Sequence, residues 1–148
     1  MADIHEGLDV TLILLHSKYK NRIEIIKNYG ILPLIECYPE QMNQVFMNIL
    51  SNAVDAIDDK GAITINTSEL NKHVQISIKD TGPGIPENIR KKIFDPFFST
   101  KEVGKGTGLG LSISQSIIEK HHGSIDIKSE LGKGTEFIIS LPVKQIKE

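Results

Sequence analysis

Two asparagines, Asn48 and Asn52, lie four positions apart in the segment QVFMNILSNAVDAI. This spacing places both amides on one face of a helix, and Asp55 falls on the same face. Two amides on a helix are more often solvated surface groups than ligands, because motifs of single residues match by chance. Two glycine-rich segments downstream favour the other interpretation, in which this face contributes to a nucleotide site.

The first glycine-rich segment, DTGPGI, begins with Asp80 and contains Gly82, Gly84 and Ile85. Glycines let a flat ligand approach the backbone closely. A fixed carboxylate is a natural acceptor for an exocyclic amine such as that of adenine. The alternative is a turn aspartate followed by glycines that make a tight bend, and these residues alone do not decide between the two.

The second glycine-rich segment, GKGTGLGLS, leads directly into an apolar helical pattern. Backbone N–H groups at the positive end of a helix bind phosphates. Lys101 and Lys105 lie in the same region, where they either neutralise phosphate charge or are solvated. The alternative for the whole segment is a flexible linker. Its spacing matches neither the Walker loop nor the dinucleotide fingerprint.

Apolar periodicity predicts the elements that position these groups. We expect helices over residues 4–19, 87–92 and 109–122, and a further helix that begins at Pro39 and ends at Gly61; Gly123 closes the helix at 109–122. We expect strands over residues 22–29, 34–38, 62–68, 73–80, 124–129 and 135–143, and a mobile loop over 95–108. The apolar stripe of the asparagine helix comprises Met42, Val45, Phe46, Ile49, Leu50, Ala53 and Ile57. This order predicts an α+β domain, with helices on one face of a mixed, mostly antiparallel sheet.

Composition limits the classes of function. The chain has 148 residues, enough for one domain, and its net charge of −2 with 24% charged residues argues against nucleic-acid binding. Cys37 is the only cysteine, which excludes an internal disulfide and fits a reducing compartment. No signal peptide is recognisable, and the apolar stretches are shorter than the roughly 20 residues that span a bilayer. We therefore expect a cytoplasmic chain without membrane contact.

Four segments in their order resemble the boxes of the catalytic ATP-binding domain of bacterial two-component sensor histidine kinases. They are NILSNAVDA, DTGPGI, FDPFF and GKGTGLGLS, and the resemblance covers roughly residues 20–143. The third segment contains three phenylalanines, Phe94, Phe97 and Phe98. They form either a hydrophobic hinge or docking patch, or part of the ordinary core. The wider group contains gyrase, heat-shock chaperone and mismatch-repair ATPases. The resemblance implies a two-layer, Bergerat-type α/β sandwich that binds ATP between the asparagine helix and a lid at residues 95–108.

The resemblance also implies a role for each site residue. Asn52 is the Mg²⁺ ligand, Asn48 lines the phosphate side, and Asp80 binds the adenine amine. Gly82, Gly84 and Ile85 shape the base pocket with Thr135, and the phosphates lie against Gly106, Thr107, Gly108, Leu109, Gly110 and Leu111. Many members of the family have a basic residue where this chain has Asp55, so Lys101 or Lys105 is expected to supply that charge.

Asn48 bears on the type of reaction. In the ATP-hydrolysing relatives and in serine kinases of the anti-sigma factor type, a glutamate stands at this position. Glutamate accepts a proton from water or a hydroxyl and asparagine does not, which favours transfer to an imidazole. Two alternatives stay open: a stand-alone protein serine kinase, and a non-catalytic module that ATP switches between binding states.

The remaining predictions concern partners. We expect residues 1–19 to be a linker helix from a missing dimerisation and histidine-phosphotransfer domain, and residues 20–148 to be the catalytic domain. The expected partners are that domain and the receiver domain of a response regulator. His5-Glu6 resembles a phosphoacceptor pair, but its spacing disagrees with the family and favours a linker histidine. The isolated chain is therefore expected to bind nucleotide without phosphorylating itself.

Overall fold

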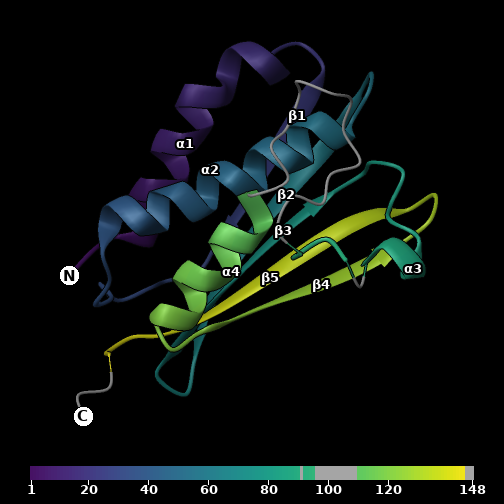
Figure 1. Cartoon of the computed structure of the whole chain (residues 1–148). Helices are drawn as coiled ribbons and strands as arrows, with labels where there is room; N and C mark the ends of the chain where they lie inside the picture. Colours follow the sequence, from purple (N-terminus) through teal and green to yellow (C-terminus); the bar gives the residue numbers. More distant parts are fainter. Residues whose placement is uncertain (91, 96–109, 146–148) are drawn as a thin grey trace.

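The computed structural model describes residues 1–90, 92–95 and 110–145, and its described part forms one sheet covered on one face by helices (Figure 1). The sheet order is β1-β2-β3-β5-β4; β1 runs parallel to β2 and the other pairs are antiparallel. The α+β prediction is thus confirmed. The elements are α1 (Ile4–Tyr19), β1 (Ile23–Tyr29), α2 (Pro39–Ala56), β2 (Gly61–Leu70), β3 (His73–Asp80), α3 (Glu87–Arg90), α4 (Gly110–Lys120), β4 (Ser124–Glu130) and β5 (Gly134–Pro142).

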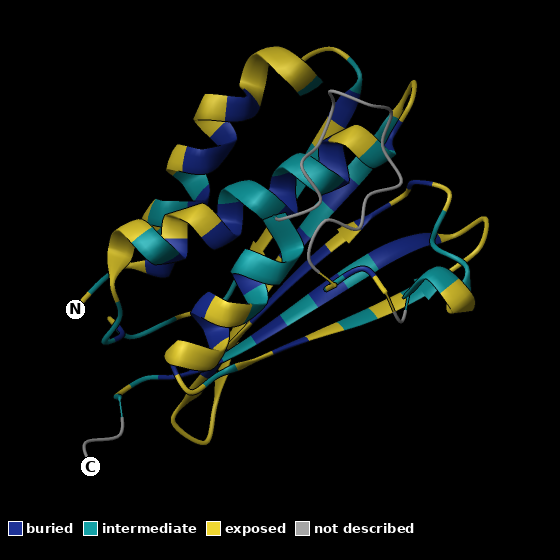
Figure 2. Ribbon diagram, viewed as in Figure 1, coloured by how far each residue is buried: buried dark blue, intermediate teal, exposed yellow. Residues whose placement is uncertain are grey.

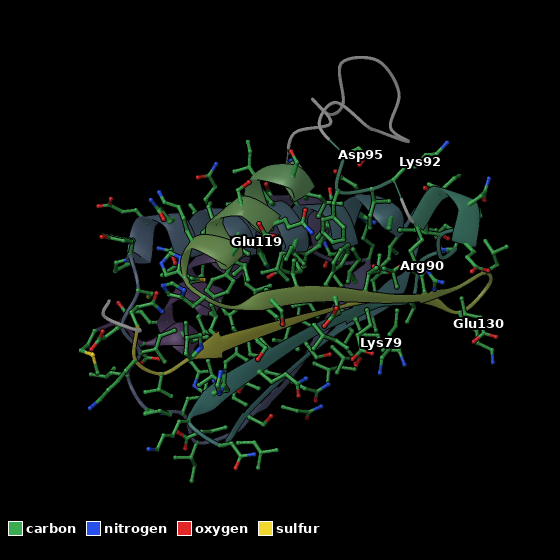
Figure 3. The ribbon with its side chains drawn as sticks, turned by 60° about the horizontal axis from the view of Figure 1, so that its bottom comes forward. Lys79, Arg90, Lys92, Asp95, Glu119 and Glu130 are labelled. Carbon is green, nitrogen blue, oxygen red and sulfur yellow. The ribbon has the colours of Figure 1, made fainter. Side chains whose placement is uncertain are left out.

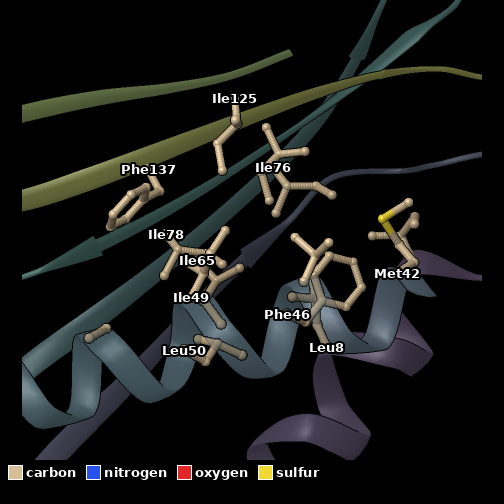
Figure 4. Packing of buried hydrophobic residues seen from close by; sticks show 14 of the residues in the cluster. Leu8, Met42, Phe46, Ile49, Leu50, Ile65, Ile76, Ile78, Ile125 and Phe137 are labelled. Carbon is tan, nitrogen blue, oxygen red and sulfur yellow. The ribbon is translucent and has the colours of Figure 1, made fainter. Parts of the chain in front are cut away.

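The core lies between α2 and the inner face of the sheet (Figure 4). The predicted apolar stripe is confirmed, since all seven of its residues are buried, six of them on α2 and Ile57 at its carboxyl-terminal cap. Alternate strand residues meet it, and among them are Ile63, Ile65, Ile76, Ile78 and Phe137. Apolar side chains recur at the helix period on α2 and at the strand period in the sheet, so the two layers bury one apolar cluster. Figure 2 shows buried residues on both α2 and the strands.

Helix α1 packs into the same core. Ile4, Leu8, Leu12 and Leu15 are buried and belong to the cluster formed by α2 and the sheet. The origin of residues 1–19 as a linker stays a prediction. No described helix combines the length and the apolar composition that a bilayer-spanning helix needs.

Three local predictions are wrong. Residues 34–38 form no strand; between Pro33 and Pro39, only an isolated bridge joins Ile35 to Ala2, because proline restricts the neighbouring backbone. Helix α2 ends at Ala56, where Ile57 turns into the core, and Gly61 opens β2 instead of capping the helix.

The end of α4 also differs from the prediction. His122, with φ of 62°, takes the left-handed position expected for glycine. Its N–H donates to the Glu119 carbonyl, and the Gly123 N–H donates to the Ile118 carbonyl, which is the Schellman pattern. Gly123 follows because an added Cβ would lie 2.2 Å from the Ser140 oxygen. Its role is close packing on β5.

Arg22 closes the carboxyl end of α2, which has no basic residue in its last turn. Its guanidinium donates to the Ile57 oxygen at 2.6 Å and to the Val54 oxygen at 3.4 Å, and Nε donates to the Lys18 oxygen. A positive group at this end of a helix satisfies terminal carbonyls and complements the helix dipole.

We expect Arg22→Ala to lower the free energy of unfolding by about 1.5–3 kcal/mol, the usual worth of hydrogen bonds from a charged group. Urea denaturation followed by circular dichroism measures it. Lys20→Ala is the matched control, because Lys20 is an exposed cation two residues away. Equal midpoints for the two variants would contradict the capping role.

Candidate nucleotide site

Asp80 ends β3 and is 3% exposed. Its Oδ1 accepts a hydrogen bond from the Gly82 N–H at 2.9 Å. Burial raises the pKa of the Asp80 carboxyl, while backbone hydrogen bonds from Gly82 and Thr135 act in the opposite direction. A buried carboxylate is costly for the fold unless its charge is compensated. A buried carboxyl group at the end of a strand is typical of a group that serves a ligand.

The segment after Asp80 packs tightly against two elements. A Cβ on Gly82 would lie 2.8 Å from the Ala56 oxygen, so this segment touches the end of α2. Gly84 has φ of +80°, and a Cβ there would lie 2.3 Å from the Glu130 oxygen. Both positions therefore require glycine for close approach of the backbone, and Gly84 also requires it for its dihedral angle.

Ser129 on β4 connects the segment that follows Asp80 to the sheet through hydrogen bonds. Its hydroxyl oxygen accepts a hydrogen bond from the Ile85 N–H at 2.7 Å and lies 2.9 Å from the Thr135 hydroxyl. Its carbonyl accepts from the Arg90 guanidinium at 3.3 Å, at the end of the sheet where α3 meets β4 (Figure 3). The structure therefore brings Ile85 and buried Thr135 together with Asp80, as the resemblance implied.

A second polar group lies between α2 and α4. The Asn48 Nδ2 donates to the Gly110 oxygen at 3.0 Å and to the Ser114 hydroxyl at 3.1 Å. The Ser114 hydroxyl donates to the same Gly110 oxygen at 2.9 Å. These contacts join the asparagine helix to the first turn of α4, where the resemblance placed phosphate-binding groups.

The other predicted site residues are only partly described. Asn52 and Asp55 follow Asn48 on α2, half-buried and exposed respectively, and Leu111 packs against the core. The phosphate-side residues Lys101, Lys105, Gly106, Thr107, Gly108 and Leu109 lie outside the described residues, as does all of the predicted lid at 95–108 except Asp95. Phe94 packs against the core, and Phe97 and Phe98 also lie outside that part of the chain.

His5 lies on the first turn of α1 and is engaged within the fold. Its ring stacks on Tyr29 with 4.1 Å between centroids, and Nε2 lies 2.7 Å from the Thr67 hydroxyl. The Tyr29 hydroxyl donates to Asp9, which also pairs with Lys27. This cluster ties α1 to β1 and β2, so His5 packs within the fold; its assignment to a linker stays a prediction.

Sequence reasoning missed Ser114 and Ser129. Ser114 is fully buried and Ser129 is half-buried, yet Ser114 is one of three serines on α4 and Ser129 is one of two on β4. The only local signal is that Ser114 lies on the apolar side of α4, four positions after Gly110.

A family of ATPases shares this arrangement. The sequence model of the family described as "Histidine kinase-, DNA gyrase B-, and HSP90-like ATPase" matches residues 37–145. The chain belongs to this family. A crystallised catalytic domain of the histidine kinase ThkA is 32% identical, with a TM-score of 0.86 over 97% of this chain and 96% of that one. The chain is thus a catalytic ATPase domain of the sensor histidine kinase type, as the four boxes predicted.

Longer proteins contain similar domains. Sporulation kinase E of Bacillus subtilis is 49% identical over 118 residues, which is 79% of this chain and 16% of that protein. Sensor histidine kinase ZraS of Escherichia coli is 42% identical over 112 residues, which is 76% of this chain and 24% of that protein. The kinase domain therefore spans about a quarter or less of the length of these curated relatives.

One related structure contains a signalling partner. ThkA in complex with the response regulator protein TrrA is 30% identical to this kinase domain, with a TM-score of 0.80. The alignment covers 95% of this chain and 40% of the ThkA chain.

Proposed function

We propose that this kinase domain binds Mg·ATP between α2 and the segment after Asp80, and positions the γ-phosphate for transfer to a histidine. That histidine belongs to a separate dimerisation domain of the parent protein, which passes the phosphate to the receiver domain of a response regulator. The observation that carries the proposal is the buried Asp80 carboxylate, which accepts backbone hydrogen bonds at a glycine-rich strand end that touches α2, the helix of Asn48 and Asn52.

The base is the best-supported part of the ligand. Asp80 accepts a hydrogen bond from the exocyclic amine of adenine. This hydrogen bond offsets part of the free energy lost when the carboxylate is buried. Gly82 and Gly84 hold the backbone that follows Asp80 close against Ala56 and Glu130, and this segment forms one wall of the proposed base pocket. Guanine carries a carbonyl where adenine carries this amine, so a carboxylate repels it and the site selects adenine.

The donor set fits magnesium. Among the described residues, no group of three His, Cys, Asp or Glu side chains could hold a metal ion. An amide oxygen of Asn52 suits a hard cation that keeps most of its water and takes its other ligands from phosphates. When bound, Mg²⁺ neutralises charge on the β- and γ-phosphates.

The remaining task of the protein is to position the γ-phosphate of ATP for attack by the acceptor imidazole. The lone pair of the acceptor imidazole nitrogen forms the N–P bond as the bond between the γ-phosphorus and the bridging oxygen breaks, and ADP leaves. No proton has to leave the attacking nitrogen first, so no general base is required. Asn48, which cannot act as one, is compatible with this reaction.

Reconstitution with the dimerisation domain of the parent protein tests the proposal. We expect ATP labelled at the γ-phosphate to yield an acid-labile phosphohistidine on that domain. Asn52→Ala should reduce the rate about 100-fold, at the upper end of what loss of a metal-supporting group costs. Gln44→Ala is the control, because it removes an exposed amide from the same helix.

The alternatives predict other products. Acid-stable phosphoserine on a partner protein would favour the stand-alone serine kinase. ATP binding without transfer to either residue would favour the non-catalytic switch.

A further inference from the structure

The amide of Asn48 is held by a closed triangle of polar atoms. Its corners are Asn48 Nδ2, the Gly110 carbonyl oxygen and the Ser114 hydroxyl, and its sides measure 3.0, 3.1 and 2.9 Å. Ser114 is completely buried. A buried hydroxyl is expensive unless it is paired, and here the pairing also restrains a side chain of the nucleotide site.

The chemistry of the triangle determines which way the amide faces. The Gly110 carbonyl only accepts, so the amide nitrogen and not Oδ1 must lie against it. The Ser114 hydrogen also points to this carbonyl, which leaves a lone pair of its oxygen for the Asn48 N–H. Flipping the amide would place Oδ1 against the carbonyl and lose both contacts of Nδ2. The asparagine therefore has one stable orientation.

This orientation decides what Asn48 can offer to a ligand. Its nitrogen is engaged with α4, and Oδ1 accepts no hydrogen bond from the described residues. Phosphate oxygens carry no hydrogen at neutral pH, so an amide oxygen does not bind them. It binds a metal ion or the hydrogens of metal-bound water.

We infer that Ser114 is a positioning residue of the nucleotide site: with the Gly110 carbonyl, it orients Asn48 so that Oδ1 faces the hydrated magnesium of Mg·ATP. The inference rests on the proposed function and assigns the effect of Ser114 to the metal-dependent part of nucleotide binding. Ser114 contacts no nucleotide itself and acts through Asn48.

Calorimetric titration of the chain with ATP, with Mg²⁺ and with EDTA, tests the inference on Ser114→Ala. We expect about 3- to 10-fold weaker binding in Mg²⁺, the worth of one neutral hydrogen bond, and unchanged binding in EDTA. In an Asn48→Ala background, the serine substitution should have no further effect. Ser116→Ala, an exposed serine on the same helix, is the control and should match the unmodified chain.

Other outcomes overturn the inference. Equal weakening with Mg²⁺ and with EDTA would show that Ser114 only stabilises the fold, and thermal unfolding of the same variant would then show a matching loss. Unchanged binding in Mg²⁺, or additive effects of the two substitutions, would exclude an action through Asn48. If the unmodified chain binds no ATP, the proposed function fails, and the inference fails with it.

Discussion

Asp80→Asn is expected to abolish ATP binding and to raise the unfolding temperature of the nucleotide-free domain by several degrees. The carboxylate loses its charge, and the new amide can turn an N–H group toward the adenine amine. A hydrogen bond to a charged group contributes about 1.5–3 kcal/mol, and an unpaired donor adds a desolvation cost, so we expect affinity to fall more than about 100-fold. Calorimetric titration measures this loss.

The gain in stability follows from the raised pKa of Asp80. A carboxyl whose pKa is higher in the folded state favours folding when protonated, and this contribution is lost as pH rises through the folded-state value. At neutral pH the ionised Asp80 therefore lowers the free energy of unfolding of the domain. The neutral asparagine carries no charge to bury and can still accept a hydrogen bond from the Gly82 N–H.

The stability difference between Asp80→Asn and the unmodified domain should therefore shrink as pH falls toward 3.8, the ordinary pKa of an aspartate. Scanning calorimetry between pH 4 and pH 8 measures it. Asp126→Asn, at an exposed position on β4, is the control and should change neither binding nor the pH profile in this way. A destabilised Asp80→Asn domain at neutral pH would contradict the assignment of Asp80 to the ligand.

Gly84→Ala should lower the free energy of unfolding much more than Gly132→Ala, although both glycines have nearly the same φ, +80° and +81°. The left-handed conformation costs any other residue about 1–2 kcal/mol, and this part is common to both variants. A Cβ on Gly84 also meets the Glu130 oxygen at 2.3 Å, whereas one on Gly132 meets nothing within 4 Å. Overpacking of this kind adds about 1–3 kcal/mol.

The same pair of variants tests the link between this segment and the nucleotide. Displacing Gly84 shifts the backbone that leads from Asp80 to Ile85 and strains the contact of Ile85 with Ser129. We expect weaker ATP binding for Gly84→Ala and unchanged binding for Gly132→Ala. Chemical denaturation and calorimetry measure both quantities, and equal results for the two glycines would refute the close approach at Gly84.

Much of the site could be predicted because its residues are close in sequence and belong to segments of strong pattern. Asn48 and Asn52 share a helix face opposite an apolar stripe, and all seven stripe residues are buried. Asp80 is predicted by its place between an alternating strand and two glycines. Each of these inferences needs only local periodicity and the chemistry of one side chain.

The residues that support the site could not be predicted in this way. Ser114 contacts Asn48 across 66 positions, Ser129 contacts Ile85 across 44, and Arg22 contacts Ile57 across 35. Which serine or arginine faces such a partner depends on how α2, α4 and the sheet pack. The end of α2 was misjudged for the same reason, since tertiary burial of Ile57 and the Arg22 cap determine it instead of a local glycine.

Calorimetric titration of the unmodified domain with ATP, with and without Mg²⁺, tests most directly whether the chain has an adenine nucleotide site. We expect saturable binding of one nucleotide per chain, tighter with Mg²⁺, and a clear preference for ATP over GTP because Asp80 requires the adenine amine. Absence of ATP binding, or equal affinity for ATP and GTP, would contradict an adenine nucleotide site built on Asp80.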